Sequence, residues 1–291
     1  MKKILGIALG LSVVLTGCSK PEAPATDATK KDTATTAEQT VTIASTGSDA
    51  DIWRYIATLP ETKEAGLKLD IKNFTDYVAM NTAVANNEVD VNAFQSYAYL
   101  VAYNEANTAK IAPLSTTYLE PMGIYSSKVK TLAEFKNGAT IAIPNDGANE
   151  SRALLLLQSA GLVKLKNDFD FVKGTSQDIV ENKKALVIKP IQMATAVRVK
   201  DEVDAIVLGN TLAMEGGLNV LKDAIYYEPI DQTTKMNVNV LAVAEARQND
   251  PVLKKVGELY HVAAVGKYVQ EHFGGTKIDV NKPVSYLTQA K

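Results

Sequence analysis

The sequence predicts an α/β fold built on mainly parallel strands. Segments that alternate in polarity, or are rich in β-branched residues, are followed repeatedly by segments with helical character. This order is typical of βαβ units. At one junction, strand 139–143 leads through the stretch 144–152 into an apolar run closed by Gly161, as in a helix with a glycine C-cap. Because ligands of open α/β sheets bind at the carboxyl ends of strands, this junction is the first candidate site.

The elements before this junction alternate between strand and helix. In order, they are strand 41–44, helix 50–65, strand 68–74, helix 75–87, strand 89–93 and a helix that begins at Phe94. An extended segment over 118–127 and a short helix over 131–135 follow. The turn over 45–49 loosely resembles a phosphate-binding loop, but it lacks the glycine pattern of such loops. It therefore indicates phosphate binding only weakly.

The elements after the junction are less regular. They are a loop over 166–187, helix 192–199, strand 203–208, strand 237–243 and terminal helices that open at Pro251. The strand 203–208 ends in Gly209 and Asn210, which form a second strand end on the side where a ligand is expected. No repeat of fixed period divides the chain.

The junction 144–152 allows two interpretations. A helix N-terminus presents unpaired N–H groups and the positive end of the helix dipole, and both suit an anion. Arg152 adds a planar fork that matches a carboxylate through two parallel hydrogen bonds. Asn149 would either cap the helix or hold a polar group of a ligand. The alternative is a capped helix start with a solvated arginine.

Aromatic side chains gather near two other predicted strand ends. Tyr77, Tyr97 and Tyr99 lie at or near the starts of helices that follow strands, and Phe94 lies beside them. Their rings would form an apolar wall and the tyrosine hydroxyls would form hydrogen bonds, which suits a small amphiphilic ligand. The alternative is a helix that packs its aromatic side chains on the sheet, and the pattern favours neither interpretation.

The first 40 residues predict export and membrane anchoring. Lysines precede a short apolar run over 4–15, which is typical of a secretory signal and too short to span a bilayer. Small residues lead to Cys18, the only cysteine, as in a bacterial lipobox. We therefore predict a signal peptide over 1–17, lipidation of Cys18, and a flexible tether over 18–40 that holds the domain to the cell envelope outside the cytoplasm. An ordinary signal peptide with a chance cysteine is the alternative.

Composition and charge argue against several function classes. The 31 Lys and Arg residues are balanced by 33 Asp and Glu residues, without the basic run that nucleic acid requires. His261 and His272 lie in predicted terminal helices and suggest no Ser-His-Asp or Cys-His arrangement. Their spacing is also a poor signal for a metal site. We therefore expect no catalysis, no metal and no cofactor.

Four ordered motifs resemble the methionine-binding lipoprotein family of bacterial ABC importers (NlpA/MetQ type). The motifs are Phe74-Thr75-Asp76-Tyr77-Val78, Asp90-Val91-Asn92-Ala93-Phe94-Gln95, Glu120-Pro121-Met122-Gly123-Ile124-Tyr125-Ser126 and the stretch from Pro144 to Gln158. The resemblance covers essentially the whole chain from residue 41 onward, and the lipobox agrees with it.

This resemblance implies a two-lobed periplasmic-binding-protein fold, in which each lobe is a mainly parallel sheet flanked by helices. Lobe one would comprise 41–126 and 236–291, and lobe two would comprise 127–235. The crossovers between them would lie near 125–127 and 233–236. A small amino acid would bind between the lobes without catalysis. The implied partner is an ABC permease with its ATPase.

The resemblance also implies roles for individual residues. Arg152 would clamp the ligand carboxylate with Asn149 nearby, and Glu120 would meet the ligand ammonium group. The motifs further match Tyr77, Phe94, Gln95 and Tyr99, and the aromatic and strand-end patterns add Tyr97 and Asn210. An aromatic wall suits a thioether, which favours methionine.

The chain departs from the family pattern at three positions. Ser96 stands where many members carry a histidine, and Gly209 and Leu212 stand where many carry an asparagine and a tyrosine. The last two departures predict a roomier cleft on the side of the second lobe. Methionine would then bind more weakly than in members with both residues, or a larger ligand would be preferred. The alternatives are another amino acid or a short peptide as ligand, or a surface lipoprotein without a transport role.

Overall fold

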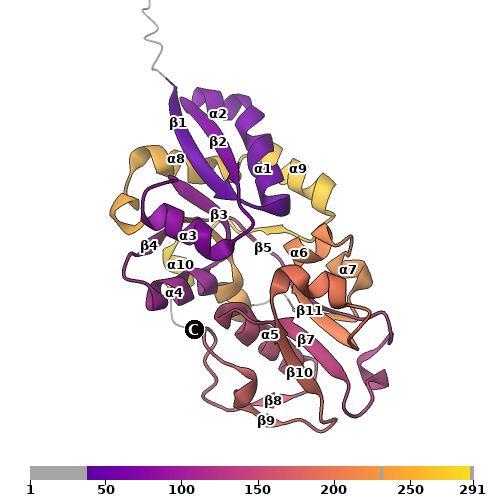
Figure 1. The fold of residues 1–291 in the computed structure, drawn as a ribbon. Coiled ribbons are helices and arrows are strands. Elements are labelled where there is room, and N and C mark those ends of the chain that lie inside the picture. The colour runs from indigo at the N-terminus through magenta and orange to yellow at the C-terminus, as the bar shows by residue number, and fades with distance from the viewer. Residues whose placement is uncertain (1–37, 230–231, 289–291) are drawn as a thin grey trace, which may run out of the picture. The chain divides into compact units, whose positions relative to one another are not determined.

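The first sheet is assembled from distant parts of the chain. The computed structural model describes residues 38–229 and 232–288. In this part of the chain the first sheet has the strand order β2-β1-β3-β13-β4 (Figure 1). Its strands are β1 (Gln39–Ser45), β2 (Leu67–Asn73), β3 (Val91–Ser96), β4 (Ile111–Thr116) and β13 (Asn239–Ala244). β1 is parallel to β2 and β3, whereas β13 is antiparallel to β3 and β4.

Helices cover both faces of the first sheet. Ile43 and Ala44 are consecutive in β1 and therefore point to opposite faces. Ile43 packs in a core with Trp53, and Ala44 packs in another core with Met80 and Leu100. The helices whose side chains pack in these cores are α1 (Gly47–Thr58), α3 (Tyr77–Ala85), α4 (Tyr97–Ala106), α8 (Pro251–Tyr260), α9 (Ala263–Phe273) and α10 (Ser285–Thr288). The short helix α2 (Pro60–Glu64) follows α1 in the chain.

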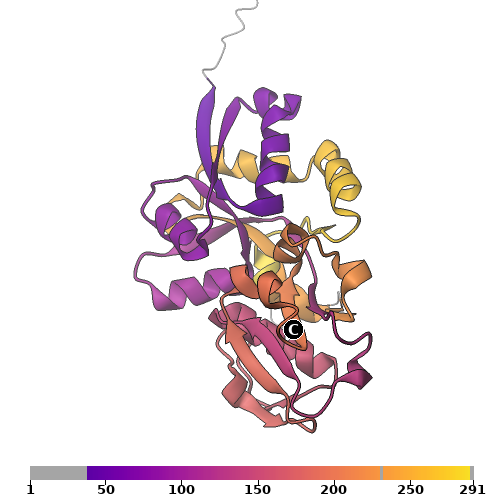
Figure 2. The same cartoon turned by 45° about the vertical axis from the view of Figure 1, so that its right-hand side comes forward.

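The second sheet is built from the middle of the chain. Its strand order is β10-β7-β11-β6-β12. The strands are β6 (Met122–Tyr125), β7 (Thr140–Pro144), β10 (Val187–Ile191), β11 (Ala205–Gly209) and β12 (Tyr226–Tyr227). β7 is parallel to β10 and β11, and β6 is antiparallel to β11 and β12. In Figures 1 and 2, the magenta-to-orange strands of this sheet lie below the indigo and yellow segments that build the first sheet and its helices.

The second sheet is also packed on both faces. Leu154 and Leu157 of α5 (Gly147–Ser159) share a core with Ile141 of β7. On the other face, Leu208 of β11 packs with Ala213 of α6 (Asn210–Glu215). The remaining elements are α7 (Val220–Asp223), the 3-10 helices Leu132–Glu134, Ser176–Asp178, Met193–Val199, Gln232–Asn237 and Glu245–Arg247, and the strand pairs β8 (Lys164–Leu165) with β9 (Ile179–Glu181) and β5 (Tyr118–Leu119) with β14 (Ile278–Asp279).

These sheets confirm the predicted α/β fold, in which each of two lobes contains a mainly parallel sheet flanked by helices. The chain passes from the first sheet to the second between β4 and β6, and returns between β12 and β13. β6 pairs within the second sheet, although the sequence assigns its residues to the first lobe. The predicted lobe boundaries themselves stay a prediction, because sheet membership does not define where a lobe ends.

Several local predictions are wrong. Phe94 does not begin a helix, because the strand continues to Ser96, whose side chain caps α4 by accepting from the Tyr99 N–H at 3.2 Å. The predicted helix over 50–65 is divided at Leu59, and Pro60 opens a separate short helix. β1 begins at Gln39, so the last residues of the predicted tether belong to a strand.

The predicted membrane-related features lie mostly outside the described residues. These are the signal peptide over 1–17, the lipidation site at Cys18 and the tether up to residue 37. Within the described part of the chain, no helix has the length and apolar character needed to cross a membrane.

Candidate ligand site

A cavity of about 60 Å³ lies between the two sheets. Its lining comes from both sheets and from the connection between them. The lining residues are Thr46, Asp49, Tyr77, Phe94, Gln95, Ser96, Tyr99, Glu120, Asn149, Arg152, Met193, Gly209, Thr211, Leu212 and Asn239. Several of these residues follow the carboxyl ends of β1, β3, β7 and β11, where ligands of α/β sheets bind. Of the predicted site residues, only Tyr97 and Asn210 do not line this cavity.

Three aromatic rings form one wall of the cavity. The ring centroids of Tyr77 and Phe94 are 5.1 Å apart, and those of Phe94 and Tyr99 are 5.8 Å apart. Tyr77 and Tyr99 meet edge to face, with an interplanar angle of 89°. Burial raises the pKa of both tyrosines above the ordinary value, so their hydroxyls stay protonated. Tyr97 packs against the same hydrophobic core as Tyr77 and Phe94 but does not line the cavity.

Gln95 is held in the cavity wall by a buried amide network. Its Nε2 donates to Asn81 Oδ1 and to Asn92 Oδ1, both at 2.7 Å. Asn81 Nδ2 donates back to Gln95 Oε1 at 3.0 Å. All three side chains are buried, so the network fixes the end of β3 against α3.

Arg152 enters the cavity from α5. The helix begins at Gly147, so Arg152 lies in its second turn. The helix cap is Asp146, whose Oδ1 accepts from the Asn149 N–H at 3.1 Å and from Asn149 Nδ2 at 2.8 Å. The predicted helical run after strand 139–143 is confirmed, and Gly161 follows it with a φ of +71°.

Arg152 is buried and already pairs with a carboxylate. Its Nε donates to Glu228 Oε1 at 3.1 Å, and its Nη2 donates to Glu228 Oε2 at 2.5 Å. Nη2 also donates to the backbone oxygen of Glu120 at 2.7 Å. Burial acts to lower the pKa of Arg152, but Glu228, with smaller contributions from Glu120 and Tyr118, outweighs burial and the pKa is raised. The alternative of a solvated arginine is therefore wrong.

Glu228 is a functional candidate that the sequence does not reveal. Besides Arg152, it accepts from Asn237 Nδ2 at 2.8 Å and from the Met122 N–H at 3.1 Å. It follows the very short strand β12, and its partner Arg152 is 76 residues away in the chain. No local pattern marks such a residue, because its role depends on long-range pairing.

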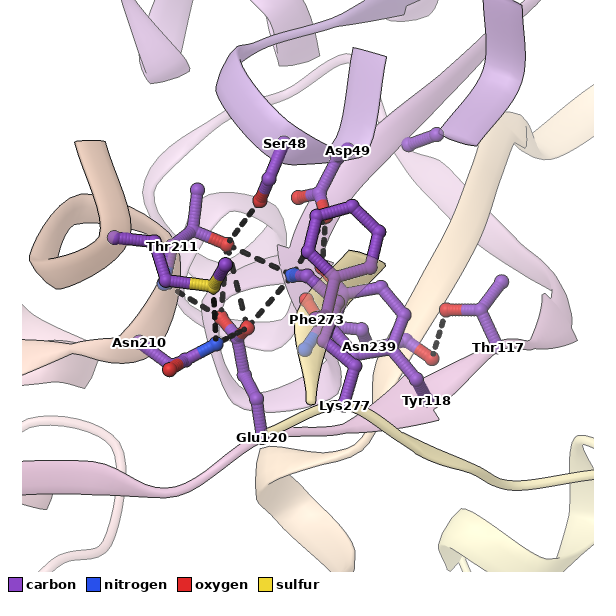
Figure 3. Close-up of polar contacts among 12 residues, drawn as sticks. Ser48, Asp49, Thr117, Tyr118, Glu120, Asn210, Thr211, Asn239, Phe273 and Lys277 are labelled. Carbon is purple, nitrogen blue, oxygen red and sulfur yellow. Dashed lines mark hydrogen bonds and ion pairs between the residues drawn. The ribbon is translucent and has the colours of Figure 1, made fainter. Parts of the chain in front are cut away.

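A second buried charge cluster surrounds Lys277 and includes the cavity residues Asp49, Glu120 and Thr211 (Figure 3). Lys277 Nζ donates to Glu120 Oε2 at 2.7 Å, to Asp49 Oδ1 at 3.0 Å and to Thr211 Oγ1 at 3.0 Å. It also lies 4.1 Å from the ring centroid of Tyr118. The Lys277 side chain has no exposed surface. Asp49 and Lys277 are further residues that sequence analysis missed, because 228 positions separate them.

Asn210 joins this cluster. Its Nδ2 donates to Glu120 Oε2 at 3.0 Å and to Thr276 Oγ1 at 3.2 Å, and its side chain is fully buried. Gly209 and Leu212, which flank it in the chain, line the cavity instead. Asn210 therefore connects α6 to the charge cluster and takes no place in the cavity wall.

The two histidines lie away from the cavity. His261 contacts Asp279 and the backbone oxygen of Thr116, at 2.8 Å and 2.9 Å, and His272 contacts the backbone oxygen of Tyr268. Within the residues that the structure describes, no group of three or more His, Cys, Asp or Glu side chains is arranged to hold a metal ion.

A model of the NlpA lipoprotein family matches residues 41–281 of the chain. The chain belongs to this family. A relative named probable D-methionine-binding lipoprotein MetQ, from Pasteurella multocida, is 32% identical over 278 residues, which cover 94% of this chain and 97% of that protein. Outer membrane lipoprotein 2 of Mannheimia haemolytica is 34% identical over 276 residues, with 94% and 97% coverage.

Solved structures of other proteins share this fold. A nutrient-binding protein from Burkholderia cenocepacia, described as bound to methionine, has a TM-score of 0.78 and 33% identity, and covers 82% of this chain and 99% of that one. Protein PG110 from Staphylococcus aureus has a TM-score of 0.81 and 36% identity, and the match covers 85% of this chain and 97% of PG110. These likenesses confirm the family that the four sequence motifs indicate.

Proposed function

We propose that this protein is the substrate-binding component of an ABC importer and captures methionine or a related small amino acid between its lobes. The observation that carries the proposal is that Arg152 and the rings of Tyr77, Phe94 and Tyr99 line one cavity. A cation and an aromatic wall in the same cavity match an amino acid with a free carboxylate and an uncharged side chain. The relative named as a D-methionine-binding lipoprotein, and the neighbour described as bound to methionine, support the same ligand class.

Arg152 is proposed to bind the ligand carboxylate with the part of its fork that Glu228 leaves open. Glu228 and the Glu120 backbone oxygen use Nε and Nη2. Among the described residues, no hydrogen bond to Nη1 is formed, so its N–H donors are available to a ligand oxygen. Glu228 would hold the guanidinium in place while Nη1 receives the carboxylate, with Asn149 beside it.

The aromatic rings are proposed to surround the ligand side chain. Contacts between a thioether sulfur and an aromatic ring contribute about 0.3–1.5 kcal/mol each, which favours methionine among uncharged amino acids. The cavity of about 60 Å³ is smaller than an apolar cavity of about 150 Å³ that binds benzene. We therefore expect the lobes to move apart when the ligand enters, as in hinge closure of other two-lobed binding proteins.

The remaining parts of the proposal concern the cell envelope. Cys18 would carry the lipid, with 1–17 as the signal peptide and the tether leading to lobe one, so that the domain lies outside the cytoplasm. An ABC permease with its ATPase would receive the ligand from the closed lobes. The protein would act by reversible binding, without catalysis.

Isothermal titration calorimetry tests the proposal with the twenty amino acids, both enantiomers of methionine, and dipeptides that contain methionine. We expect methionine to bind with a stoichiometry near one. Because Gly209 and Leu212 supply neither an amide nor a ring to the cavity wall, we expect weaker binding than in family members with asparagine and tyrosine there. If none of these ligands binds, the proposed function is wrong. If only dipeptides bind, the transport role stands but the ligand class changes.

A further inference from the structure

The two carboxylates that line the cavity beside Lys277 differ in what they offer a ligand. We propose that Asp49, and not Glu120, receives the amino group of the bound amino acid. This inference rests on the proposed function and assigns a residue of the same site. It contradicts the role for Glu120 that the family resemblance implies, and it follows from counting hydrogen bonds at each carboxylate.

Glu120 is already occupied by partners from this chain (Figure 3). Its Oε2 accepts from Lys277 Nζ at 2.7 Å and from Asn210 Nδ2 at 3.0 Å. Its Oε1 accepts from Thr211 Oγ1 at 3.1 Å and lies 3.4 Å from the Thr211 backbone nitrogen. A carboxylate has about four acceptor positions, and these contacts use nearly all of them. Glu120 therefore has little capacity left for a ligand ammonium group.

One carboxylate oxygen of Asp49 receives no hydrogen bond from the described residues. Its Oδ1 accepts from Tyr118 OH at 2.5 Å and from Lys277 Nζ at 3.0 Å. Among the described residues, none donates a hydrogen bond to Oδ2, although the side chain is only 4% exposed and lines the cavity. An ammonium group in the cavity would give Oδ2 a hydrogen bond that the described residues do not supply. A hydrogen bond between two charged groups is stronger than one between neutral groups.

The charges in the cluster agree with this assignment. Lys277 neutralises one of the two carboxylates that it contacts, so one negative charge remains beside the cavity. Burial raises the pKa of Asp49. At Glu120 burial also acts to raise the pKa, but Lys277, Asn210 and Arg152 together outweigh it and the pKa is lowered. Lys277 therefore neutralises mainly the charge of Glu120, and the negative charge of Asp49 is only partly neutralised.

The assignment also places the two charged ends of the ligand on different lobes. Asp49 lies in the first turn of α1, which packs with the first sheet, and Arg152 lies on α5, which packs with the second. An α-amino acid that contacts both would connect the lobes through its own carboxylate and ammonium groups. The closed state would then be favoured only by a ligand that carries both groups.

The test compares two probes, L-methionine and 4-(methylthio)butanoate, which is methionine without its amino group. In the wild-type protein, calorimetry should show that methionine binds at least about tenfold more tightly, as expected for a charged hydrogen bond. In Asp49→Asn this ratio should fall to near one. In Glu120→Gln the ratio should persist, even if both affinities fall. Asp51→Asn is the matched control, because Asp51 is exposed and its only ion pair with a described residue is the one with Arg54.

Both test variants keep a balanced charge cluster. Asp49→Asn leaves Lys277 with Glu120, and Glu120→Gln leaves Lys277 with Asp49, so both proteins are expected to fold. Thermal unfolding checks this, and Asp49→Ser serves in the same comparison if the asparagine variant is unstable. A ratio that is lost in Glu120→Gln and kept in the Asp49 variants overturns the inference. Absence of methionine binding to the wild type instead overturns the proposed function, so the two failures are distinguishable.

Discussion

At the scale of single residues, the site depends on ion pairs between residues far apart in the chain, which local sequence patterns do not predict. Seven of the cavity residues were predicted, because a family motif and a predicted strand end coincide there or nearby. These are Tyr77, Phe94, Gln95, Tyr99, Glu120, Asn149 and Arg152. Other lining residues, such as Thr46, Thr211 and Asn239, were not predicted. Glu228 could not be predicted, because only the folded chain brings it to Arg152. The same limit applies to Asp49 and Lys277, whose contact joins the first helix of the described chain to a segment near its end.

The first prediction at this scale concerns the carboxylate clamp. Replacing Arg152 alone would leave Glu228 buried without its cation, which confuses binding with folding. The double variant Arg152→Ala, Glu228→Gln removes both charges. We expect methionine affinity to fall by about two to four decades, equivalent to about 3–5 kcal/mol, measured by calorimetry.

The control for this prediction is Glu228→Gln alone. Its amide still accepts one hydrogen bond from Arg152, so methionine affinity should fall by less than about tenfold. Nearly unchanged binding in the double variant would show that the ligand carboxylate is held elsewhere in the cavity.

At the scale of helices and strands, the sequence predicted which elements exist better than where they end. The segment from Phe94 to Ser96 has aromatic content that suggests a helix, yet it is the end of β3. Its partner is β13, where Val240 lies opposite Gln95 and Asn239 opposite Ser96. Because that strand lies more than 140 residues later in the chain, short-range patterns cannot reveal the pairing that extends β3.

The start of α5 supports a prediction about helix capping. Asp146 accepts from both nitrogens of Asn149 and so fixes the first turn of the helix that carries Arg152. Asp146→Ala should destabilise the protein by about 1 kcal/mol. For a domain of this size the unfolding midpoint should fall by about 2–4 °C, measured by differential scanning calorimetry.

The matched control for the cap is Asp146→Asn. Asparagine caps helices about as well as aspartate, and the pKa of Asp146 is already raised by burial, so loss of the charge should cost little. If the alanine and asparagine variants unfold at the same temperature, the contacts to Asn149 do not stabilise the helix start.

At the scale of the whole molecule, the fold could be predicted because its order of strands and helices is regular and its family motifs are ordered along the chain. The strand pairings at the connection between the two sheets could not be predicted. β6 pairs in the second sheet, and the short pair of β5 with β14 joins the segment before β6 to the segment after α9. The same two segments carry Glu120 and Lys277, so the connection between the sheets also places the charge cluster beside the cavity.

The last prediction separates membrane anchoring from ligand binding. If Cys18 carries a lipid, Cys18→Ala should abolish partitioning of the exported protein into the detergent phase of a two-phase extraction, because the chain has no other cysteine. Methionine affinity should stay unchanged, since every residue that lines the cavity lies between Thr46 and Asn239. Phase partitioning followed by immunoblotting measures the first effect, and calorimetry on the recovered protein measures the second. Unchanged partitioning of the variant would refute lipidation at Cys18, and weakened binding would show that the N-terminal region contributes to the site.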